Sequence, residues 1–151
     1  MRTTLIALAI ITTLTVAATS LASEREVAVG TAVAVGELQL RPTTPGGPQG
    51  VGLFRQTGAT LRGWVVVWDL APRSRHAVHF HGPKSACGQK ADPVAAHADL
   101  VANARGVAYA IVSVRSPVQV LRKGFYYNVH ARPFTAAENP EIACANVVPI
   151  P

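Results

Sequence analysis

The sequence contains little charge, one methionine and only two cysteines among its 151 residues. Charged residues make up 15% of the chain and apolar residues 49%, which excludes disorder caused by high charge and low hydrophobicity. Eleven prolines and twelve glycines interrupt the chain too often for long helices. The length fits one domain. Five histidines and the two cysteines remain as the residues with metal or redox chemistry.

The N-terminal segment has the pattern of a secretory signal peptide. Arg2 is followed by an uncharged, largely apolar run that ends in the small residues of Ser20-Leu21-Ala22. We therefore predict a signal peptide at 1–22 and a mature domain at 23–151, with an uncleaved anchor as the alternative. No later run resembles a membrane span. We expect a secreted or periplasmic protein without stable membrane insertion once the leader is removed.

Export would place Cys87 and Cys144 in an oxidising compartment. An even pair of cysteines there is most simply a disulfide. In the chain-entropy model its closure contributes about 4 kcal/mol to stability. A metal-ligating pair is the alternative, but these cysteines lack the C-x-x-C spacing of zinc sites.

Apolar residues alternate with period two along most of the mature chain. The predicted strands cover 26–41 with a bulge at Gly36, 51–56, 60–70, 76–81, 98–103, 107–114, 117–121, 124–130 and 141–148. A turn is expected at 42–50 and a loop at 82–96. Many short strands without a convincing helix predict an all-β fold, either an antiparallel sandwich or a closed barrel.

The segment 76–81 (HAVHFH) carries three of the histidines. On a strand, successive side chains point to opposite faces, so His79 and His81 share one face. His76 shares the apolar face with Phe80, and we interpret it as a core histidine bonded to the backbone. Imidazoles at i and i+2 can converge on one metal ion, although such a pair is about as often a pair of surface or hydrogen-bonding histidines.

A further histidine, His130, ends the predicted strand at 124–130. Two adjacent imidazoles and a third from another strand suit copper or zinc better than calcium or magnesium. His97 is a possible fourth ligand.

Five short motifs occur in the order in which a known family has them. The family pattern L-x-P-G-x-H-G-F-H-x-H is similar to Leu70-Ala71-Pro72 followed by 76–81. The later motifs are a cysteine at Cys87, an H-x-x-D-L-like element at 97–100, a V-V-H-like strand end at 128–130 and an A-C-G-V-I-G-I-like segment at 143–150. Together they resemble the Cu/Zn superoxide dismutase superfamily over nearly the whole mature chain.

The resemblance implies an eight-stranded Greek-key β-barrel with a disulfide between Cys87 and Cys144. It implies copper as the cofactor and superoxide dismutation as the activity, with superoxide as the small anionic substrate. The implied copper ligands are His79, His81 and His130, and His76 is implied to lie behind them.

Two departures from the family concern metals and loops. The family's zinc loop supplies several histidines, whereas only His97 and the aspartates at 92 and 99 are available here, so zinc is not expected. Only 13 residues separate His130 from Cys144, so the family's long electrostatic loop is absent. Copper-only members of the superfamily lack the same two features.

A third departure concerns the approach of superoxide. The family's arginine, three residues before the second cysteine, is replaced by Glu141. A carboxylate there would repel superoxide, and Arg132 is the candidate for guiding the anion instead. The formal net charge of +6, or +5 after loss of Arg2 with the leader, modestly favours an anionic substrate.

The same stretches also resemble CHRD domains. The CHRD patterns H-I-H-G-P and Y-V-N-V-H-T with N-P-G-G-E-I are similar to 79–83, 126–130 and 139–142. In that interpretation Glu141 is the expected residue, and the protein is a non-catalytic or copper-holding binding domain. A zinc hydrolase lacks an obvious general base. Nucleic acid is not an expected partner, because the basic residues are scattered. No oligomeric state is predicted.

Overall fold

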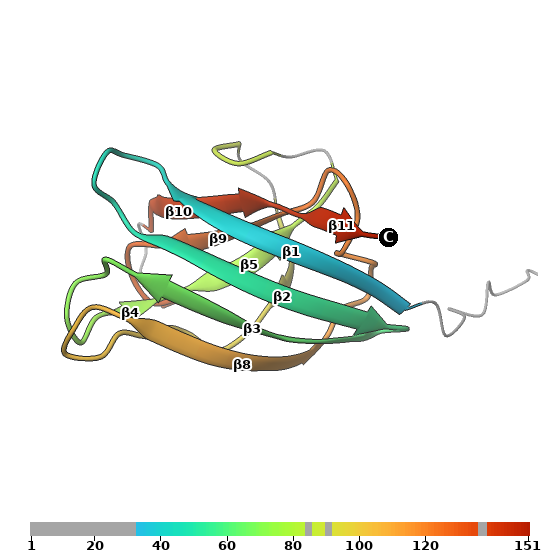
Figure 1. Ribbon diagram of the computed structural model, residues 1–151, viewed down its shortest axis with the longest axis horizontal. Coiled ribbons are helices and arrows are strands. Elements are labelled where there is room, and N and C mark those ends of the chain that lie inside the picture. The colour runs from blue at the N-terminus through green and yellow to red at the C-terminus, as the bar shows by residue number, and fades with distance from the viewer. Residues whose placement is uncertain (1–32, 84–85, 90–91, 136–138) are drawn as a thin grey trace, which may run out of the picture.

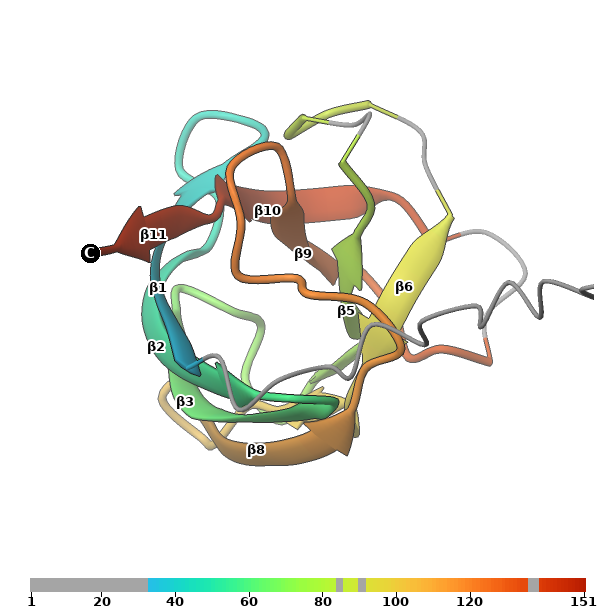
Figure 2. The same ribbon diagram turned by 90° about the vertical axis from the view of Figure 1, so that its right-hand side faces the viewer.

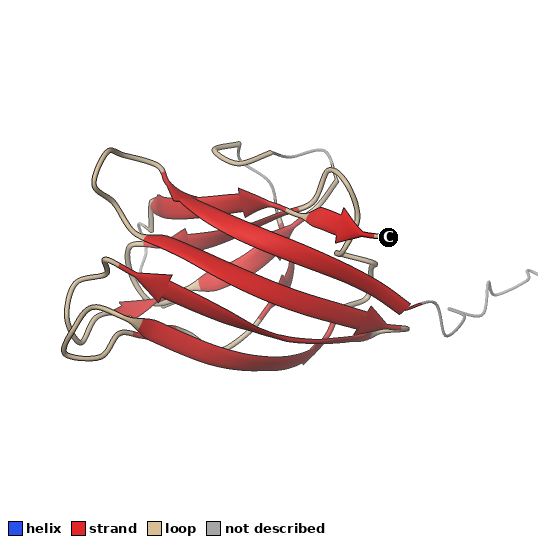
Figure 3. Cartoon of the chain, viewed as in Figure 1, coloured by secondary structure: helices blue, strands red, loops and turns tan. Residues whose placement is uncertain are grey.

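The computed structural model describes residues 33–83, 86–89, 92–135 and 139–151. Every regular element in these ranges is a β-strand (Figure 3). Among the described residues there is no helix with the length and apolarity needed to cross a membrane. The all-β prediction is confirmed, while the predicted signal peptide at 1–22 lies outside the described residues.

The described residues form eleven strands. They are β1 (Val33–Pro42), β2 (Gln49–Thr57), β3 (Thr60–Trp68), β4 (Arg75–His76), β5 (Val78–His81), β6 (Pro93–Ala96), β7 (Leu100–Val101), β8 (Ala108–Arg115), β9 (Tyr126–His130), β10 (Glu141–Asn146) and β11 (Val148–Ile150).

Eight of these strands form one antiparallel sheet in the order β6-β5-β9-β10-β1-β2-β3-β8, and β11 adds to β1 (Figure 1). The sheet curls into a nearly closed barrel, in which β1, β2, β3 and β8 face β5, β9 and β10 (Figure 2). The strand order departs from chain order where β8 joins β3 and where β9 lies between β5 and β10. These are the crossed connections of a Greek-key barrel.

Aromatic and branched side chains fill the barrel interior. The ring of Phe54 packs edge-on against Phe80 at a centroid distance of 5.3 Å, and Phe80 packs against Tyr127 at 4.9 Å. On the opposing strand, a Cβ atom at Gly63 would lie only 2.7 Å from Cδ1 of Phe54, so the glycine makes room for this ring. The core therefore joins the two walls of the barrel through edge-to-face contacts between aromatic rings.

Four details of the predicted strands are wrong. The predicted strand at 76–81 is divided between β4 and β5, which belong to different sheets. Residues 117–121 form no strand, because the Gln56 side chain satisfies their backbone: its amide donates to the Val118 carbonyl, and its oxygen accepts from Val120 N. Gly36 is not a bulge, since it pairs in register with Phe54. Residues 93–96, expected in a loop, form β6 and pair with β5.

Cys87 and Cys144 form a disulfide with a Cα–Cα distance of 5.6 Å, as predicted. The bond fastens the segment 86–89 to β10, and hydrogen bonds strengthen the attachment. The Tyr126 hydroxyl donates to the Gln89 carbonyl at 2.6 Å, and Cys87 N donates to Oδ1 of Asn146 at 3.3 Å. The segment thereby contacts the outward side of β9 and β10.

Candidate metal centre

Strands β5 and β9 pair so that three histidines lie on their outward side. Val78 pairs with Val129 and Phe80 with Tyr127, and these side chains belong to the barrel core. The intervening residues point the other way. His79 pairs with Asn128, two residues before His130, so a diagonal neighbour across the two strands brings these histidines together.

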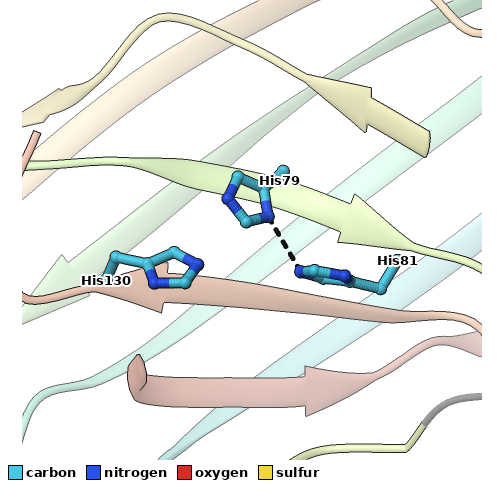
Figure 4. A group of neighbouring side chains, drawn as sticks. All are labelled: His79, His81 and His130. Carbon is cyan, nitrogen blue, oxygen red and sulfur yellow. Dashed lines mark hydrogen bonds between the residues drawn. The ribbon is translucent and has the colours of Figure 1, made fainter. Parts of the chain in front are cut away.

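The three imidazoles converge on one point (Figure 4). One ring nitrogen from each of His79, His81 and His130 lies within 4.8 Å of the other two, and the nitrogens of the first two rings, Nδ1 of His79 and Nε2 of His81, form a hydrogen bond of 2.8 Å. The ring centroid of His79 is 4.7 Å from that of His81 and 4.5 Å from that of His130. These residues are close enough to hold one metal ion.

His130 is oriented for metal binding by its second ring nitrogen. Nδ1 donates to the Asn139 carbonyl at 2.6 Å, so the lone pair is on Nε2. Within the described part of the chain, Nε2 is buried and has no hydrogen-bond partner. A buried polar atom without a partner costs about 1–3 kcal/mol. A metal ion bound by this lone pair would remove that cost, so the donor set fits a metal.

His76 lies behind the cluster. It is buried, and its Nδ1 donates to the carbonyl of His130 at 2.7 Å. Nε2 forms a hydrogen bond with Oγ of Ser74. His76 therefore holds the end of β9, and it contacts the ligand strand through the backbone.

His97, considered above as a fourth ligand, lies outside the group of converging nitrogens. Its Nδ1 donates to the Ala98 carbonyl at 2.8 Å, which leaves Nε2 to accept from the Tyr127 hydroxyl at 2.7 Å. Both ring nitrogens are thus occupied. The structure brings together the other three candidate ligands and leaves this one beside them.

Burial keeps His79 neutral. Desolvation, followed in order of size by repulsion from His130, His81 and His97, lowers its pKa from 6.5 to about 4. Desolvation also lowers the pKa of His97, opposed by the Ala98 carbonyl and Asp99. Neutral imidazoles at pH 7 present lone pairs, which is the form that binds metal ions.

A cavity of about 630 Å³ opens beside the cluster. It is lined by His81, Gly88, Gln89, Asp92, Tyr126, Asn128, His130, Asn139, Pro140 and Glu141. Two of these are carboxylates, and the lining contains no lysine or arginine among the described residues. Arg132, the candidate guide for an anion, is exposed and does not line this cavity.

Glu141 is held in this cavity by two donors. Oε2 accepts from Nδ2 of Asn128 at 3.1 Å and Oε1 from Gly88 N at 3.2 Å. Burial, followed by repulsion from this carboxylate, raises the pKa of Tyr126. Glu141 and Asp92 therefore place two carboxylates beside the histidines.

Two residues that position the histidines were not among the candidates from the sequence. Asn139 orients His130 through its carbonyl, and its side chain forms hydrogen bonds with N and O of Arg132 at 2.7 and 2.8 Å. Tyr126 stacks on His81 with a centroid distance of 4.5 Å. Tyr126 could have been placed on the same face as His130, because the two lie four residues apart on one strand. No spacing in the sequence indicates that Asn139 orients His130.

No model of a known protein family matches the chain, and no curated protein matches it either. The conclusion that the structure supports is a β-barrel with a disulfide and a three-histidine group that could hold a metal ion.

Proposed function

We propose that the protein binds one copper ion through Nδ1 of His79, Nε2 of His81 and Nε2 of His130. The observation that carries this proposal is the buried, unpartnered Nε2 of His130, aimed at two other imidazoles. The hydrogen bond between His79 and His81 would give way to the metal, and its proton would move to the other nitrogen of the ring that carries it. Three imidazole donors suit copper, and the motif order shared with superoxide dismutases supports that choice over zinc.

We further propose that the copper-loaded protein dismutates superoxide. Two superoxide ions and two protons give one dioxygen and one hydrogen peroxide, because one superoxide loses an electron and the other gains it. Bound copper would supply the one-electron redox chemistry by alternating between Cu(II) and Cu(I).

The chain's own residues hold and shield this site. Neutral His79 can bind a cation without first losing a proton at pH 7. Asn139 and His76 fix the ring and the backbone of His130, respectively. The segment 86–89 covers part of the outward face and leaves the cavity as the approach.

A second candidate function is copper binding without turnover, as in a CHRD-like binding domain. The observation in its favour is the pair of carboxylates, Glu141 and Asp92, in the cavity beside the histidines. A negative approach disfavours an anionic substrate. It does not disfavour the binding of a cation.

We also propose that the protein acts outside the cytoplasm, in the periplasm or after secretion. The disulfide supports this location, since such bonds persist in oxidising compartments. The leader-like segment of the sequence agrees with it.

Metal content tests the site. Copper-loaded protein, after removal of free metal, should contain one copper per chain. His130→Ala should lose it, whereas His97→Gln, which changes an imidazole outside the group, should retain it. Retention of stoichiometric copper by both His79→Ala and His130→Ala would show that the site is wrong.

Superoxide decay then separates the two functions. The copper-loaded protein should accelerate the decay, and the metal-free protein should not. Stoichiometric copper without accelerated decay would reject the dismutase and support the binding domain.

A further inference from the structure

The outward face of the opposite wall, formed by β1, β2, β3 and β8, has its own chemical pattern. Strand register aligns its side chains in rows that run across the strands. One row contains Val35, Arg55, Arg62 and Ser113. The next row contains Glu37, Leu53, Trp64 and Ile111, and the one after it Gln39, Val51, Val66 and Tyr109.

Arginines gather at one end of this face. Arg55 and Arg62 pair directly opposite each other, and Arg115 pairs with Thr60 in the adjoining row. Like charges directly opposite are destabilising in a sheet. Among the described residues, none of these three arginines forms a salt bridge with a carboxylate. The salt bridge in the described part of the chain joins Arg75 to Asp99, outside this cluster. Within the described ranges, the cluster therefore has positive charge without a carboxylate that neutralises it.

A small cavity lies within this cluster. It is lined by Arg55, Thr57, Thr60 and Arg62, and its volume is about 380 Å³. The two guanidinium groups supply positively charged hydrogen-bond donors. The two hydroxyls can rotate to donate as well. Guanidinium groups match the oxygens of a phosphate bidentately. The chemistry of the cavity therefore fits a phosphate group.

An apolar band adjoins the arginines. Its members are exposed without a partner in the described chain, and Ile111 and Tyr109 keep 77% and 59% of their surface accessible. Leu53, Trp64 and Val51 complete the band. Tryptophan and tyrosine beside arginine form the combination found where proteins meet the headgroup region of a membrane.

We propose that this face binds the surface of an anionic phospholipid membrane. A lipid phosphate occupies the cavity between Arg55 and Arg62, and Trp64 and Ile111 lie against the adjoining acyl and glycerol region. We choose a membrane as the binding partner because the partner must neutralise three arginines and cover an apolar band at the same time. Glu37 contributes a carboxylate to the outward face of these four strands. Its side chain accepts a hydrogen bond from the Gln39 amide.

A second copy of the chain fits this face less well. Stacking two such faces would bury six arginines against at most two copies of Glu37, and buried unpaired charges are strongly destabilising. A membrane surface offers many phosphates and adapts to the spacing of the guanidinium groups.

Vesicle sedimentation tests the proposal, with the protein purified after export. It should bind vesicles of phosphatidylglycerol mixed with phosphatidylcholine, and bind pure phosphatidylcholine much more weakly. Arg55→Gln combined with Arg62→Gln should lower the partition coefficient by roughly twentyfold. Removal of the same charge at Arg122 and Lys123, in the turn before β9, is the matched control and should have a much smaller effect.

Tryptophan fluorescence supplies the second readout. Trp64 should shift to shorter wavelength on the mixed vesicles, and the shift should shrink in Trp64→Phe. Copper content should stay unchanged in the arginine variant, which separates this proposal from that of the metal site.

Three results would overturn the proposal. The first is vesicle binding that survives the double arginine substitution. The second is protection of the arginines by inorganic phosphate alone, without preference for vesicles, which would indicate a soluble phosphate ligand. The third is a concentration-dependent dimer that is lost in Ile111→Gln, which would show that the face binds a second copy.

Discussion

Strands β2 and β5 belong to the same barrel, yet they are buried in different ways. β2 alternates strictly between exposed and buried residues, whereas all four residues of β5 are buried. The outward side of β2 is exposed, whereas on the outward side of β5 the ring of Phe134 packs against His79 and that of Tyr126 against His81. Strict alternation therefore marks a wall between the core and solvent. Its loss marks a wall whose outward side is also buried, and there desolvation lowers the pKa of His79.

The disulfide that holds segment 86–89 against β10 should have the largest effect on stability. Cys87→Ser combined with Cys144→Ser should lower the free energy of unfolding by about 4 kcal/mol, because the unfolded chain regains the freedom of a loop spanning 57 residues. Urea denaturation under non-reducing conditions measures it. An unchanged midpoint would mean that segment 86–89 is held by other contacts, and reduced wild-type protein is the control.

The desolvated histidines should make stability depend on pH. In the metal-free folded protein, His79 takes up its proton at a pKa of about 4, compared with 6.5 for an unperturbed histidine. Unfolding therefore takes up a proton between these values, and stability falls as the pH drops from about 6.5 to 4, by roughly 3 kcal/mol in all.

Denaturation at a series of pH values checks this dependence. His79→Gln should flatten most of it, and the remainder should come from His97, whose pKa is lowered in the same direction. An equal slope in wild type and His79→Gln would assign the dependence to other groups.

The carboxylate beside the histidines should have a smaller effect. If copper-loaded protein reacts with superoxide, Glu141→Gln should raise the rate by roughly tenfold at low ionic strength and by less at physiological salt. Glu37→Gln, which removes a carboxylate from the outward face of β1, β2, β3 and β8 (the bare wall), should leave the rate unchanged. Equal rates for wild type and Glu141→Gln would mean that this charge does not act on the approach of the substrate.

Substitutions on the bare wall should have small effects on stability, and one of them should be stabilising. Arg62→Thr relieves the repulsion opposite Arg55 and should raise the free energy of unfolding by a few tenths of a kcal/mol. Arg115→Thr, which faces Thr60 instead of a cation, should give no such gain. A loss of stability in Arg62→Thr would indicate that its aliphatic stem packs on the sheet.

The strands around Phe54 and Val65 could be predicted from the sequence, because 51–56 and 60–70 are rich in β-branched and aromatic residues. Their outward apolar residues, such as Leu53 and Trp64, could not, because they break the period-two pattern. The strand at 117–121 was wrong for a long-range reason, since Gln56, distant in sequence, bonds to its backbone. The parity of His79 and His81 could also be predicted. Their meeting with His130 could not be derived from spacing, because it depends on the register between β5 and β9. The role of Asn139 depends on the path of the chain after β9.

The central claim is that His79, His81 and His130 together bind copper, and electron paramagnetic resonance of the Cu(II)-loaded protein tests it most directly. Hyperfine splitting should show three imidazole nitrogens in the wild-type protein. His130→Ala should lose the metal or show one nitrogen fewer, and His97→Gln should keep the wild-type spectrum. A wild-type spectrum in His130→Ala would contradict the claim.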